Sequence, residues 1–336
     1  MDLTKLSRQA WTSACMTAAG FAVLLGSLGQ FGRISVPLDA INNFSQIWMA
    51  AGVAGGLGLI LVNGTARIWG IVAIVLMWTT AAVNFGSALL PVTDDRLTPE
   101  LQIVQFNAYK ANQTPDKSAQ WILDQEPDIV ILEEGALAGF KVRDLLRQTL
   151  PYTSDCLGSD GHRCSTMILS AEPPIASGGL AEGDPENRQT LSAAWARFDS
   201  DKGPFTVVGV HMRRPWPYDD QTADLQRLRA FVRSLNSPLT IVAGDFNQTP
   251  WTFGEKALRE RMGLRLVTSG FRTWPALPLP VPGHPIIPLL AIDHVYAGPG
   301  WAITSIERGL PIGSDHLPVV VSMTTQSRRP KANPPM

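Results

Sequence analysis

Three long stretches near the N-terminus contain no charged residue, and they constrain the fold of this chain more than any other feature. They run from Trp11 to Leu28, Phe44 to Val62 and Ile68 to Leu90, with 18, 19 and 23 residues. A helix of about 18 residues or more crosses the ~30 Å hydrocarbon layer of a bilayer. The sequence therefore predicts three transmembrane helices, at about residues 11–28, 44–62 and 68–90, within an anchor spanning residues 1–92.

Basic residues near the ends of these stretches predict their orientation. Lys5, Arg8 and Arg67 fall on one side of the membrane, and Arg33 and Arg96 fall on the other. Because cytoplasmic loops carry the excess of basic residues, the N-terminus is expected in the cytoplasm. After three crossings, the rest of the chain lies outside, which in a bacterial inner membrane is the periplasm. A cleaved signal peptide is the alternative for the first stretch, although no small-x-small cleavage site follows it cleanly.

The remainder of the chain has the composition of a globular domain. Residues 1–98 carry 5 of the 28 basic and 4 of the 29 acidic residues, which leaves 23 and 25 for residues 99–336. We expect a linker at 93–98, a folded domain at 99–323 and a disordered polar, proline-rich tail at 324–336. Three cysteines exclude a disulfide-rich framework, but Cys156 and Cys164 flank a short turn and are candidates for a disulfide in an oxidising compartment.

Short apolar runs alternate with helix-like segments in this domain. Eight strands are expected, at 101–106, 128–132, 165–170, 191–198, 205–210, 239–243, 292–296 and 319–323. Four helices are expected, at 117–125, 140–149, 219–235 and 253–262. The mixture predicts an α/β or α+β domain in which helices cover sheets.

Acids, amides and histidines recur where these strands end. They are Asn107, Glu133, Glu134, His211, Asp245, Asn247, Asp293, His294, Asp315 and His316. Carboxylates and amides without cysteine are hard oxygen ligands, suited to Mg²⁺, Mn²⁺ or Ca²⁺ rather than zinc. Histidines beside them suit acid and base chemistry near neutral pH. A hard cation with a base and an acid is what phosphate-ester hydrolysis requires.

Together these residues resemble the endonuclease/exonuclease/phosphatase superfamily, which includes DNase I, apurinic endonucleases, inositol polyphosphate phosphatases and neutral sphingomyelinases. The resemblance covers about residues 99–323. It rests on the motifs at 104–107, 131–134, 210–211, 244–247 and 314–316, with Ile292-Asp-His-Val295 between the last two. It implies a DNase I-like four-layer α/β/β/α sandwich after the three transmembrane helices, and a metal-dependent hydrolase of phosphoric esters, most simply phosphodiesters.

The resemblance also implies roles for single residues. Asn107 and Glu134 would hold Mg²⁺, with Mn²⁺ or Ca²⁺ as alternatives, and Asp315 would lie beside the metal and the phosphate. Asp245 would orient or activate the attacking water. The remaining catalytic candidates carry over as follows: Asn247 donates to the phosphate, Asp293 pairs with His316, and His211 serves the phosphate or the leaving group. DNase I-like members orient that histidine with a glutamate after an arginine, where this chain has Arg188-Gln189.

The substrate remains open between nucleic acid and a phospholipid or small phosphate ester. Arg213, Arg214 and Trp216 follow His211 and are candidate substrate-binding residues, and Trp274 is a candidate second wall. A domain net charge of −2 argues against a non-specific nucleic-acid binder, while a membrane anchor favours lipid-linked phosphates. The alternative to an enzyme is a catalytically inactive, membrane-tethered binding protein on the same fold. The sequence does not indicate an oligomeric state.

Overall fold

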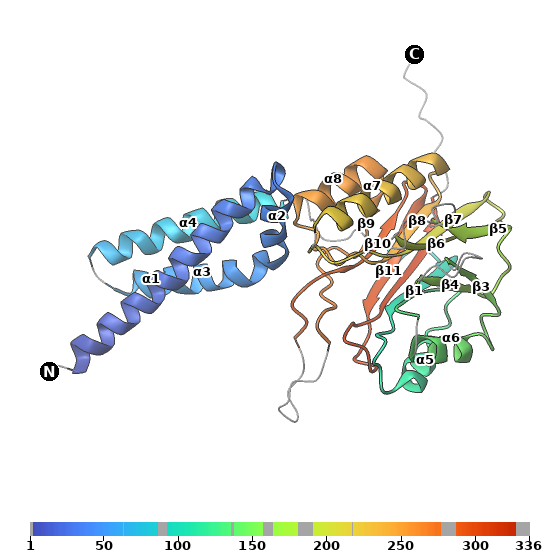
Figure 1. The fold of residues 1–336 in the computed structure, drawn as a ribbon, viewed down its shortest axis with the longest axis horizontal. Helices are drawn as coiled ribbons and strands as arrows, with labels where there is room; N and C mark the ends of the chain where they lie inside the picture. The colour runs from blue at the N-terminus through green and yellow to red at the C-terminus, as the bar shows by residue number, and fades with distance from the viewer. Residues whose placement is uncertain are drawn as a thin grey trace, which may run out of the picture. The chain divides into compact units, whose positions relative to one another are not determined.

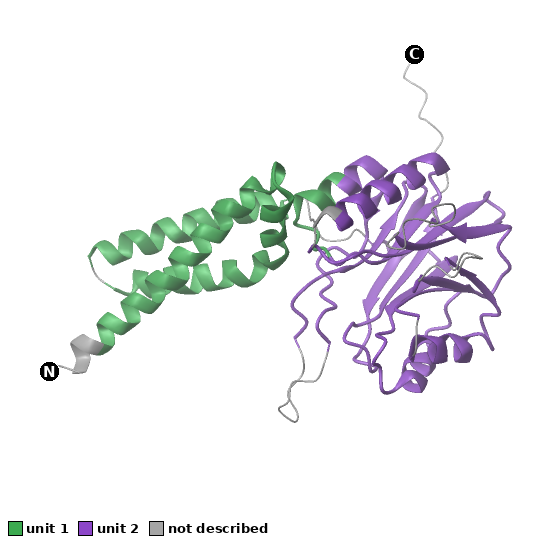
Figure 2. Ribbon diagram, in the orientation of Figure 1, with its two compact units in different colours: residues 1–89, 248–257 green, residues 90–247, 258–336 purple. Residues whose placement is uncertain are grey.

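The computed structural model describes residues 3–62, 64–86, 93–135, 138–156, 164–180, 191–216, 218–276 and 287–326. It divides into two compact units, coloured separately in Figure 2. The first comprises Met1–Leu89 together with Gln248–Ala257, and the second comprises Leu90–Asn247 together with Leu258–Met336. The segment 248–257 therefore packs with the N-terminal helices although it lies far from them in the sequence.

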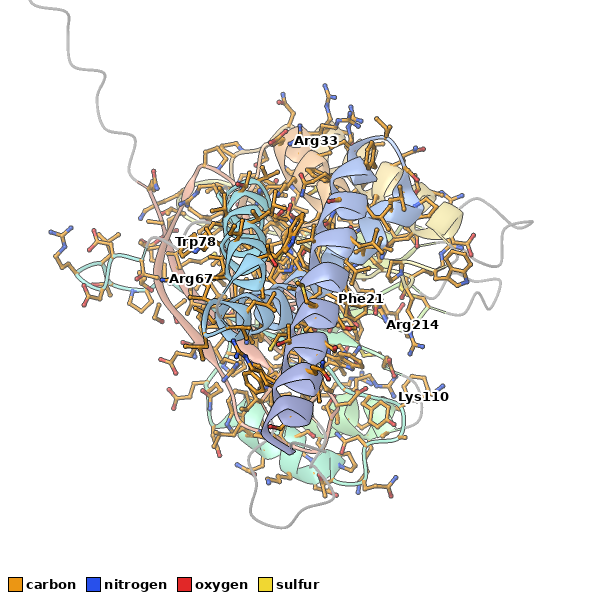
Figure 3. All side chains as sticks on the ribbon, turned by 90° about the vertical axis from the view of Figure 1, so that its left-hand side faces the viewer. Phe21, Arg33, Arg67, Trp78, Lys110 and Arg214 are labelled. Carbon is orange, nitrogen blue, oxygen red and sulfur yellow. A yellow bond between two sulfur atoms is a disulfide. The ribbon has the colours of Figure 1, made fainter. Side chains whose placement is uncertain are left out.

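The first unit is built on three helices, α1 (Leu3–Gln30), α3 (Ser45–Ile60) and α4 (Thr65–Phe85). The short elements η1 (Phe31–Arg33), α2 (Val36–Asp39) and η2 (Ala40–Phe44) connect α1 to α3. Glycines on α3 allow close packing, because a Cβ atom at Gly55 would lie 2.8 Å from the Cys15 carbonyl oxygen of α1. Apolar side chains such as Phe21 and Trp78 are exposed and point outward (Figure 3), as expected of surfaces that face lipid.

Two of the three expected spans are long and apolar enough to cross a membrane. These are Ser7–Arg33, with 27 residues, and Thr65–Phe85, with 21. The expected third span, at 44–62, is shorter than predicted, because α3 has 16 residues and the turn before it is a 3₁₀ helix. α3 begins one residue later and ends two residues earlier than the predicted span. The buried polar side chains of Asn42, Asn43 and Ser45 bond within the connection that precedes it.

The second unit contains two six-stranded sheets (Figure 1). The order of the first sheet is β11-β12-β1-β2-β4-β3, and that of the second is β5-β6-β7-β8-β10-β9. The first sheet comprises β1 (Leu101–Asn107), β2 (Ile129–Glu133), β3 (Tyr152–Asp155), β4 (Met167–Ser170), β11 (Trp301–Arg308) and β12 (Val319–Thr325). The second comprises β5 (Ala176–Gly179), β6 (Ser192–Phe198), β7 (Phe205–His211), β8 (Thr240–Asp245), β9 (Arg265–Leu266) and β10 (Asp293–Ala297).

Alternation along the strands produces the layers. Ile103, Ile131, Val207 and Ile241 belong to one buried cluster, which joins the inner faces of both sheets. The opposite face of the first sheet packs against α5 (Pro115–Leu123) and α6 (Ala138–Leu146), and that of the second packs against α7 (Tyr218–Leu235) and α8 (Phe253–Met262). The predicted four-layer sandwich is thus confirmed. Thr324 and Thr325 were assigned to the tail, but they are the last residues of β12.

Candidate active site

Polar residues from both sheets gather where the central strands end. The parallel strands β1 and β2 end at the paired positions Asn107 and Glu133. In the second sheet, His211 of β7 pairs with Asp245 of β8, and Asp293 of the antiparallel strand β10 also pairs with Asp245. Parallel strands bring their carboxyl ends to one edge, so residues from distant parts of the chain meet there.

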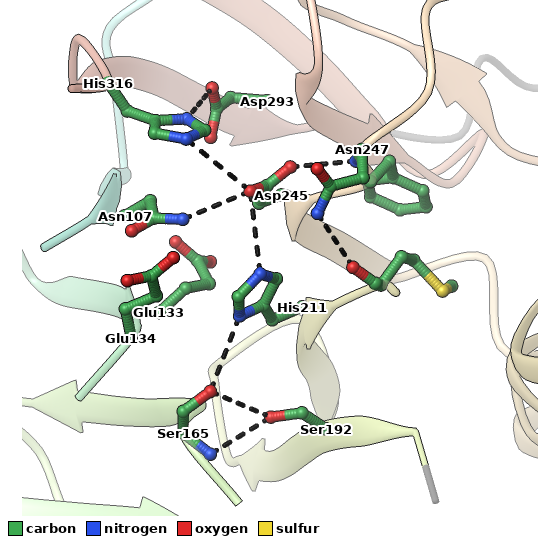
Figure 4. A network of polar contacts seen from close by, with 12 residues as sticks. Asn107, Glu133, Glu134, Ser165, Ser192, His211, Asp245, Asn247, Asp293 and His316 are labelled. Atoms are coloured by element: carbon green, nitrogen blue, oxygen red, sulfur yellow. Dashed lines mark hydrogen bonds and ion pairs between the residues drawn. The ribbon is translucent and has the colours of Figure 1, made fainter. Parts of the chain in front are cut away.

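Asp245 is the centre of this arrangement (Figure 4). Its Oδ2 accepts a hydrogen bond from Asn107 Nδ2 at 3.1 Å and lies 3.7 Å from Nε2 of both His211 and His316. Its Oδ1 accepts the backbone N–H of Asn247 at 2.8 Å. Burial raises the pKa of the Asp245 carboxyl, and the nearby charge of His316 partly offsets this. The carboxylate therefore depends on these neighbours to remain ionised.

Asp293 and His316 form a buried hydrogen-bonded pair. Asp293 Oδ2 lies 2.8 Å from His316 Nδ1 and also accepts a hydrogen bond from the Thr273 hydroxyl. Burial alone would lower the pKa of His316, but the charges of Asp293 and Asp245 raise it to about 10. Conversely, burial alone would raise the pKa of Asp293, but the His316 charge and its hydrogen-bond donors lower it. At neutral pH the pair is an imidazolium–carboxylate pair.

Gln105 connects this pair to the end of β2. Its Nε2 donates to Asp293 Oδ1 and to Glu133 Oε2, both at 2.9 Å. Burial, followed by the charges of Asp293 and Asp245, raises the pKa of the Glu133 carboxyl well above its usual range. The Glu133 carboxyl is therefore protonated more readily here than it would be in water.

His211 is held differently from His316. Its Nδ1 lies 3.4 Å from the Ser165 hydroxyl, and the Ser165 backbone N–H donates to Ser192 Oγ at 3.1 Å. The partner of His211 Nδ1 is thus a neutral hydroxyl, whereas that of His316 Nδ1 is a carboxylate. Arg188-Gln189, the sequence match to that motif, lies outside the described residues.

Oxygen atoms suited to a hard cation lie on the Asn107 side of the cluster. Glu134 follows β2, and its Oε2 accepts the Lys110 backbone N–H at 3.0 Å. Its φ of 50° places it in the left-handed region, which is costly for a glutamate and common at functional sites. Among the described residues, Glu133 Oε1 and Asp315 Oδ1 are buried without a hydrogen-bond partner. Such orphaned carboxylate oxygens fit the ligands of a divalent cation.

A second group of possible ligand atoms overlaps with the hydrogen-bonded pair. Asp245, Asp293 and His316 each offer one ligand atom, and these atoms lie within 4.8 Å of one another. A cation bound by all three would compete with the 2.8 Å contact between Asp293 and His316. The carboxylate oxygens near Asn107 and Glu134 are therefore the better metal candidates.

The candidate substrate-binding residues have different surroundings. Arg213 forms two hydrogen bonds, at 2.7 and 2.8 Å, with the buried carboxylate of Asp224 on α7. Arg214 and Trp216 are exposed. Trp274 donates from Nε1 to Asp315 Oδ2 at 3.3 Å, so it contacts a site carboxylate. Arg214 and Trp216 are thus more accessible to a ligand than Arg213.

The predicted cysteine pair is present. Cys156 and Cys164 form a disulfide. Cys164 Sγ lies 3.3 Å from Ser192 Oγ, and Ser165 follows it directly in the chain. The bridge therefore closes the segment next to the residue that contacts His211.

A known protein family matches the part of the sequence that carries this site. The model of the Endonuclease/Exonuclease/phosphatase family matches residues 104–316, which spans the site from β1 to His316. The chain belongs to this family. Among curated proteins, none matches the sequence.

Solved structures of other proteins share the fold of this chain. An endonuclease/exonuclease/phosphatase family protein from Bacteroides thetaiotaomicron has a TM-score of 0.54 and 18% identity, over 69% of this chain and 100% of that one. A mannosyl-6-phosphatase from the same organism has a TM-score of 0.53 and 18% identity, over 67% and 100%. A beta toxin mutant from Staphylococcus aureus with bound magnesium ions has a TM-score of 0.50 and 16% identity, over 67% and 99%. At these identities the likeness shows the shared fold.

Sequence reasoning missed the residues that hold the expected ones. Gln105, Ser165 and Thr273 carry ordinary polar side chains inside apolar or loop segments, so no local pattern marks them. Ser314 was part of a recognised motif without a role, and its hydroxyl donates to the Asn107 carbonyl at 2.6 Å. The signal for Gln105 was its position two residues before Asn107, on the same face of β1.

Proposed function

We propose that this chain is a membrane-anchored, metal-dependent phosphodiesterase. The observation that carries the proposal is the surroundings of Asp245. A buried carboxylate has two imidazole Nε2 atoms at 3.7 Å and an amide donor at 3.1 Å. Such a cluster of acids and histidines at the carboxyl ends of strands can orient a water molecule and stabilise the charge of a phosphoryl group. We therefore assign the family's hydrolase chemistry to the Asp245 carboxylate and the imidazole and amide groups around it.

Asn107, Glu134 and Asp315 would hold Mg²⁺, or Mn²⁺ or Ca²⁺ in its place. The orphaned Asp315 oxygen and the acidic, cysteine-free donor set support this assignment. When bound, the ion would neutralise phosphate charge and make nearby water more acidic. The S. aureus beta toxin of the same fold contains bound magnesium ions.

The side chains then have complementary tasks. Asp245 orients the attacking water through Oδ2, while the N–H of Asn247 holds its other oxygen. His316 donates a hydrogen bond from Nδ1 to Asp293. Its Nε2 is then free of that contact, faces the reaction centre and donates to the phosphate. His211, on the other side of Asp245, contacts the phosphate or the leaving oxygen.

The anchor and the disulfide support a location in a bacterial inner membrane with the site in the periplasm. Disulfides persist in oxidising compartments, and Cys156 and Cys164 lie beyond the apolar helices in the chain. The bias of Lys5, Arg8 and Arg67 favours a cytoplasmic N-terminus. This orientation requires an odd number of crossings, so the short helix α3 must span as well. A reporter fused after Pro99 that functions only in the cytoplasm would overturn it.

Exposed side chains near His211 support an anionic substrate with a flat or apolar part. The exposed side chain of Arg214 can bind a phosphate, and Trp216, 72% exposed, offers a ring for stacking. Both suit a nucleic acid strand and a lipid head group. We propose a phosphodiester of one of these classes.

The test uses the full chain purified in detergent with Mg²⁺. Three substrates are compared: supercoiled plasmid, phospholipid vesicles and bis(p-nitrophenyl) phosphate. We expect turnover of at least one, lost on chelation and lowered about 10³-fold or more in Asp245→Asn, which preserves shape but not charge. Thermal unfolding of the variant controls for its folding. Turnover that is unchanged in a folded Asp245→Asn would overturn the role of Asp245.

An inactive binding protein on the same fold is the alternative function. It predicts that the wild-type chain binds Mn²⁺ or a phosphodiester without turning it over. Absence of turnover for all three substrates, with binding retained, would favour that alternative. Nicking of the plasmid alone would make the protein a nuclease, and release of a lipid head group alone would make it a phospholipid hydrolase.

A further inference from the structure

The connection between α1 and α3 contains a cluster of buried polar side chains that a membrane tether does not need. Its members are Asp39, Asn42, Asn43, Ser45 and, from α4, Asn84, each at most 3% exposed. Asn84 Nδ2 donates to Asn42 Oδ1 at 3.3 Å and to Ser45 Oγ at 3.2 Å. Asn42 Nδ2 in turn donates to Asp39 Oδ1 at 2.8 Å. Burying five polar residues costs free energy unless each is hydrogen-bonded. Asp39 and Asn43 have further hydrogen-bond partners outside this cluster.

These partners lie in the segment Gln248–Ala257, which belongs to the same compact unit. The helix α8 begins in this segment at Phe253, and its first backbone N–H groups have no partner inside the helix. Asp39 Oδ1 accepts the Phe253 N–H at 2.9 Å, and Asp39 Oδ2 accepts the Gly254 N–H at 2.7 Å. Thr252 Oγ1 accepts the next one, from Glu255, at 3.3 Å. A carboxylate more than 200 positions away in the chain thus caps two of these three donors.

A second contact lies closer to the catalytic motif. Asn43 Oδ1 accepts the backbone N–H of Thr249 at 2.8 Å and faces its hydroxyl at 3.3 Å. Thr249 is fully buried. Further along the segment, the rings of Phe85 and Trp251 meet edge to face at 4.8 Å. Hydrogen bonds and ring packing together fix the course of this segment against the anchor.

The fixed segment follows Asn247 directly in the chain. Asn247 has a φ of 48°, in the left-handed region, where a residue persists only if its surroundings hold it. Before it, the Asp245 carboxylate accepts the Asn247 N–H, and the Asn247 side chain donates to the Met212 carbonyl at 2.8 Å. After it, Gln248 leads to Thr249, which Asn43 holds. The turn is therefore secured on both sides, and on one side by the anchor.

We propose that Asn43 and Asp39 are positioning residues for the catalytic turn: they hold residues 249–254 and thereby keep Asn247 in its left-handed conformation. The activity part of this inference rests on the proposed function. The first compact unit then holds residues 248–257, which continue directly from the catalytic turn in the chain. Asn43 acts closest to the turn, and Asp39 acts through the N-terminus of α8.

The experiment compares variants of the full chain in detergent. Asn43→Ala removes the acceptor of the Thr249 N–H, while Asn43→Asp keeps it. Asp39→Ala removes both acceptors at α8, and Asp39→Asn keeps one. Asn84→Ala is the matched control, because it removes buried hydrogen bonds of the same cluster without touching residues 248–257. Turnover is measured as kcat and KM separately, and hydrogen–deuterium exchange is followed in peptides that cover residues 245–256.

We expect Asn43→Ala to lower kcat about 10- to 100-fold with little change in KM, and Asn43→Asp to restore most of it. Exchange in peptides 245–256 should accelerate in Asn43→Ala and Asp39→Ala, and less in Asn84→Ala. An equal loss of kcat in Asn84→Ala, or unchanged kcat and exchange in both alanine variants, would overturn the inference. If the wild-type chain has no turnover, the proposed function fails, but the exchange measurement still decides whether the anchor holds the turn.

Discussion

The pair of Asp293 and His316 predicts a pH dependence of stability that can be worked out from the structure. His316 has a pKa of about 10 in the folded chain, against an ordinary value of 6.5 for histidine. A pKa raised on folding means that the folded state binds the His316 proton more tightly than the unfolded state does. Its contribution is fully present below pH 6.5 and is lost as the pH rises through about 10. The relevant window is therefore alkaline.

The magnitude follows from these two pKa values. One pKa unit corresponds to about 1.4 kcal/mol, so the His316 proton contributes about 4 kcal/mol at pH 7 and less than 1 kcal/mol, roughly, at pH 10. The lowered pKa of Asp293 gives a contribution that is constant above about pH 4. The raised pKa of Glu133 opposes stability as the pH rises in both proteins, and the His316 charge lowers that pKa. The difference between the two proteins therefore reports the His316 charge together with its effect on the neighbouring carboxyl groups.

The assay is thermal unfolding of wild type and His316→Gln in detergent with a chelator, at pH 7 and pH 10. Glutamine can still donate a hydrogen bond to Asp293 but carries no charge. For a domain of this size, about 4 kcal/mol corresponds to a Tm difference of about 10 °C. We expect the Tm difference between wild type and His316→Gln to be about 10 °C smaller at pH 10 than at pH 7. A gap that stays constant would show that His316 is neutral at pH 7 and would refute the reasoning.

Four further predictions concern other parts of the catalytic domain. Gly244→Ala should prevent folding or lower stability by more than about 4 kcal/mol, because a Cβ atom there would lie 1.8 Å from the Val210 carbonyl oxygen; a Tm equal to wild type would contradict this. Arg213→Ala should lower the free energy of unfolding by about 3 kcal/mol, since it leaves the buried Asp224 unpaired. Arg214→Ala should instead raise KM about 3- to 10-fold with an unchanged Tm. A raised KM in Arg213→Ala with a lowered Tm in Arg214→Ala would mean that Arg213 binds the substrate and Arg214 stabilises the fold. Chelation should abolish turnover, and Mg²⁺ should restore it; activity that survives dialysis against a chelator would argue against a metal.

The fold was predictable where strands lie inside a sheet and was missed at the sheet edges. All eight predicted strands and all four predicted helices of the domain are present, with ends shifted by a few residues. The four strands that were missed, β3, β5, β9 and β11, are the outermost strands of the two sheets. An edge strand has one neighbour and one exposed side, so it lacks the continuous apolar run that marks a central strand. β5, with the sequence Ala-Ser-Gly-Gly, carries almost no β signal at all.

The site was predictable to the extent that its residues end strands. Asn107, His211 and Asp245 end apolar strands, Asp293 begins one, and the structure brings all four together. The interactions between the sheets could not be predicted, because they depend on how two sheets face each other. The hydrogen bond from Gln105 to Asp293 joins residues 188 positions apart, and no local pattern encodes such a pairing.

The anchor also contains buried residues whose burial could not be predicted from the sequence. Hydropathy predicts apolar helices well, but it treats Asp39, Asn42 and Asn43 as part of a polar connection between spans. The structure buries all three. Asp39 and Asn43 have partners in residues 248–257, and Asn42 accepts from Asn84 of α4, so these contacts are long-range and a window of about 19 residues does not include them.

The energetic cost of the site favours an enzyme over an inert binding protein. Asp245, Asp293 and Glu133 are buried together; the charge of Asp293 raises the pKa of both Glu133 and Asp245, and the charge of Asp245 raises that of Glu133. Replacing a buried charged cluster with well-packed apolar residues is often neutral or stabilising. A protein that used this fold only as a scaffold would lose nothing by such replacements. The retention of three carboxylates with an imidazolium, in a site where their charges oppose burial, is understandable if those charges act on a substrate.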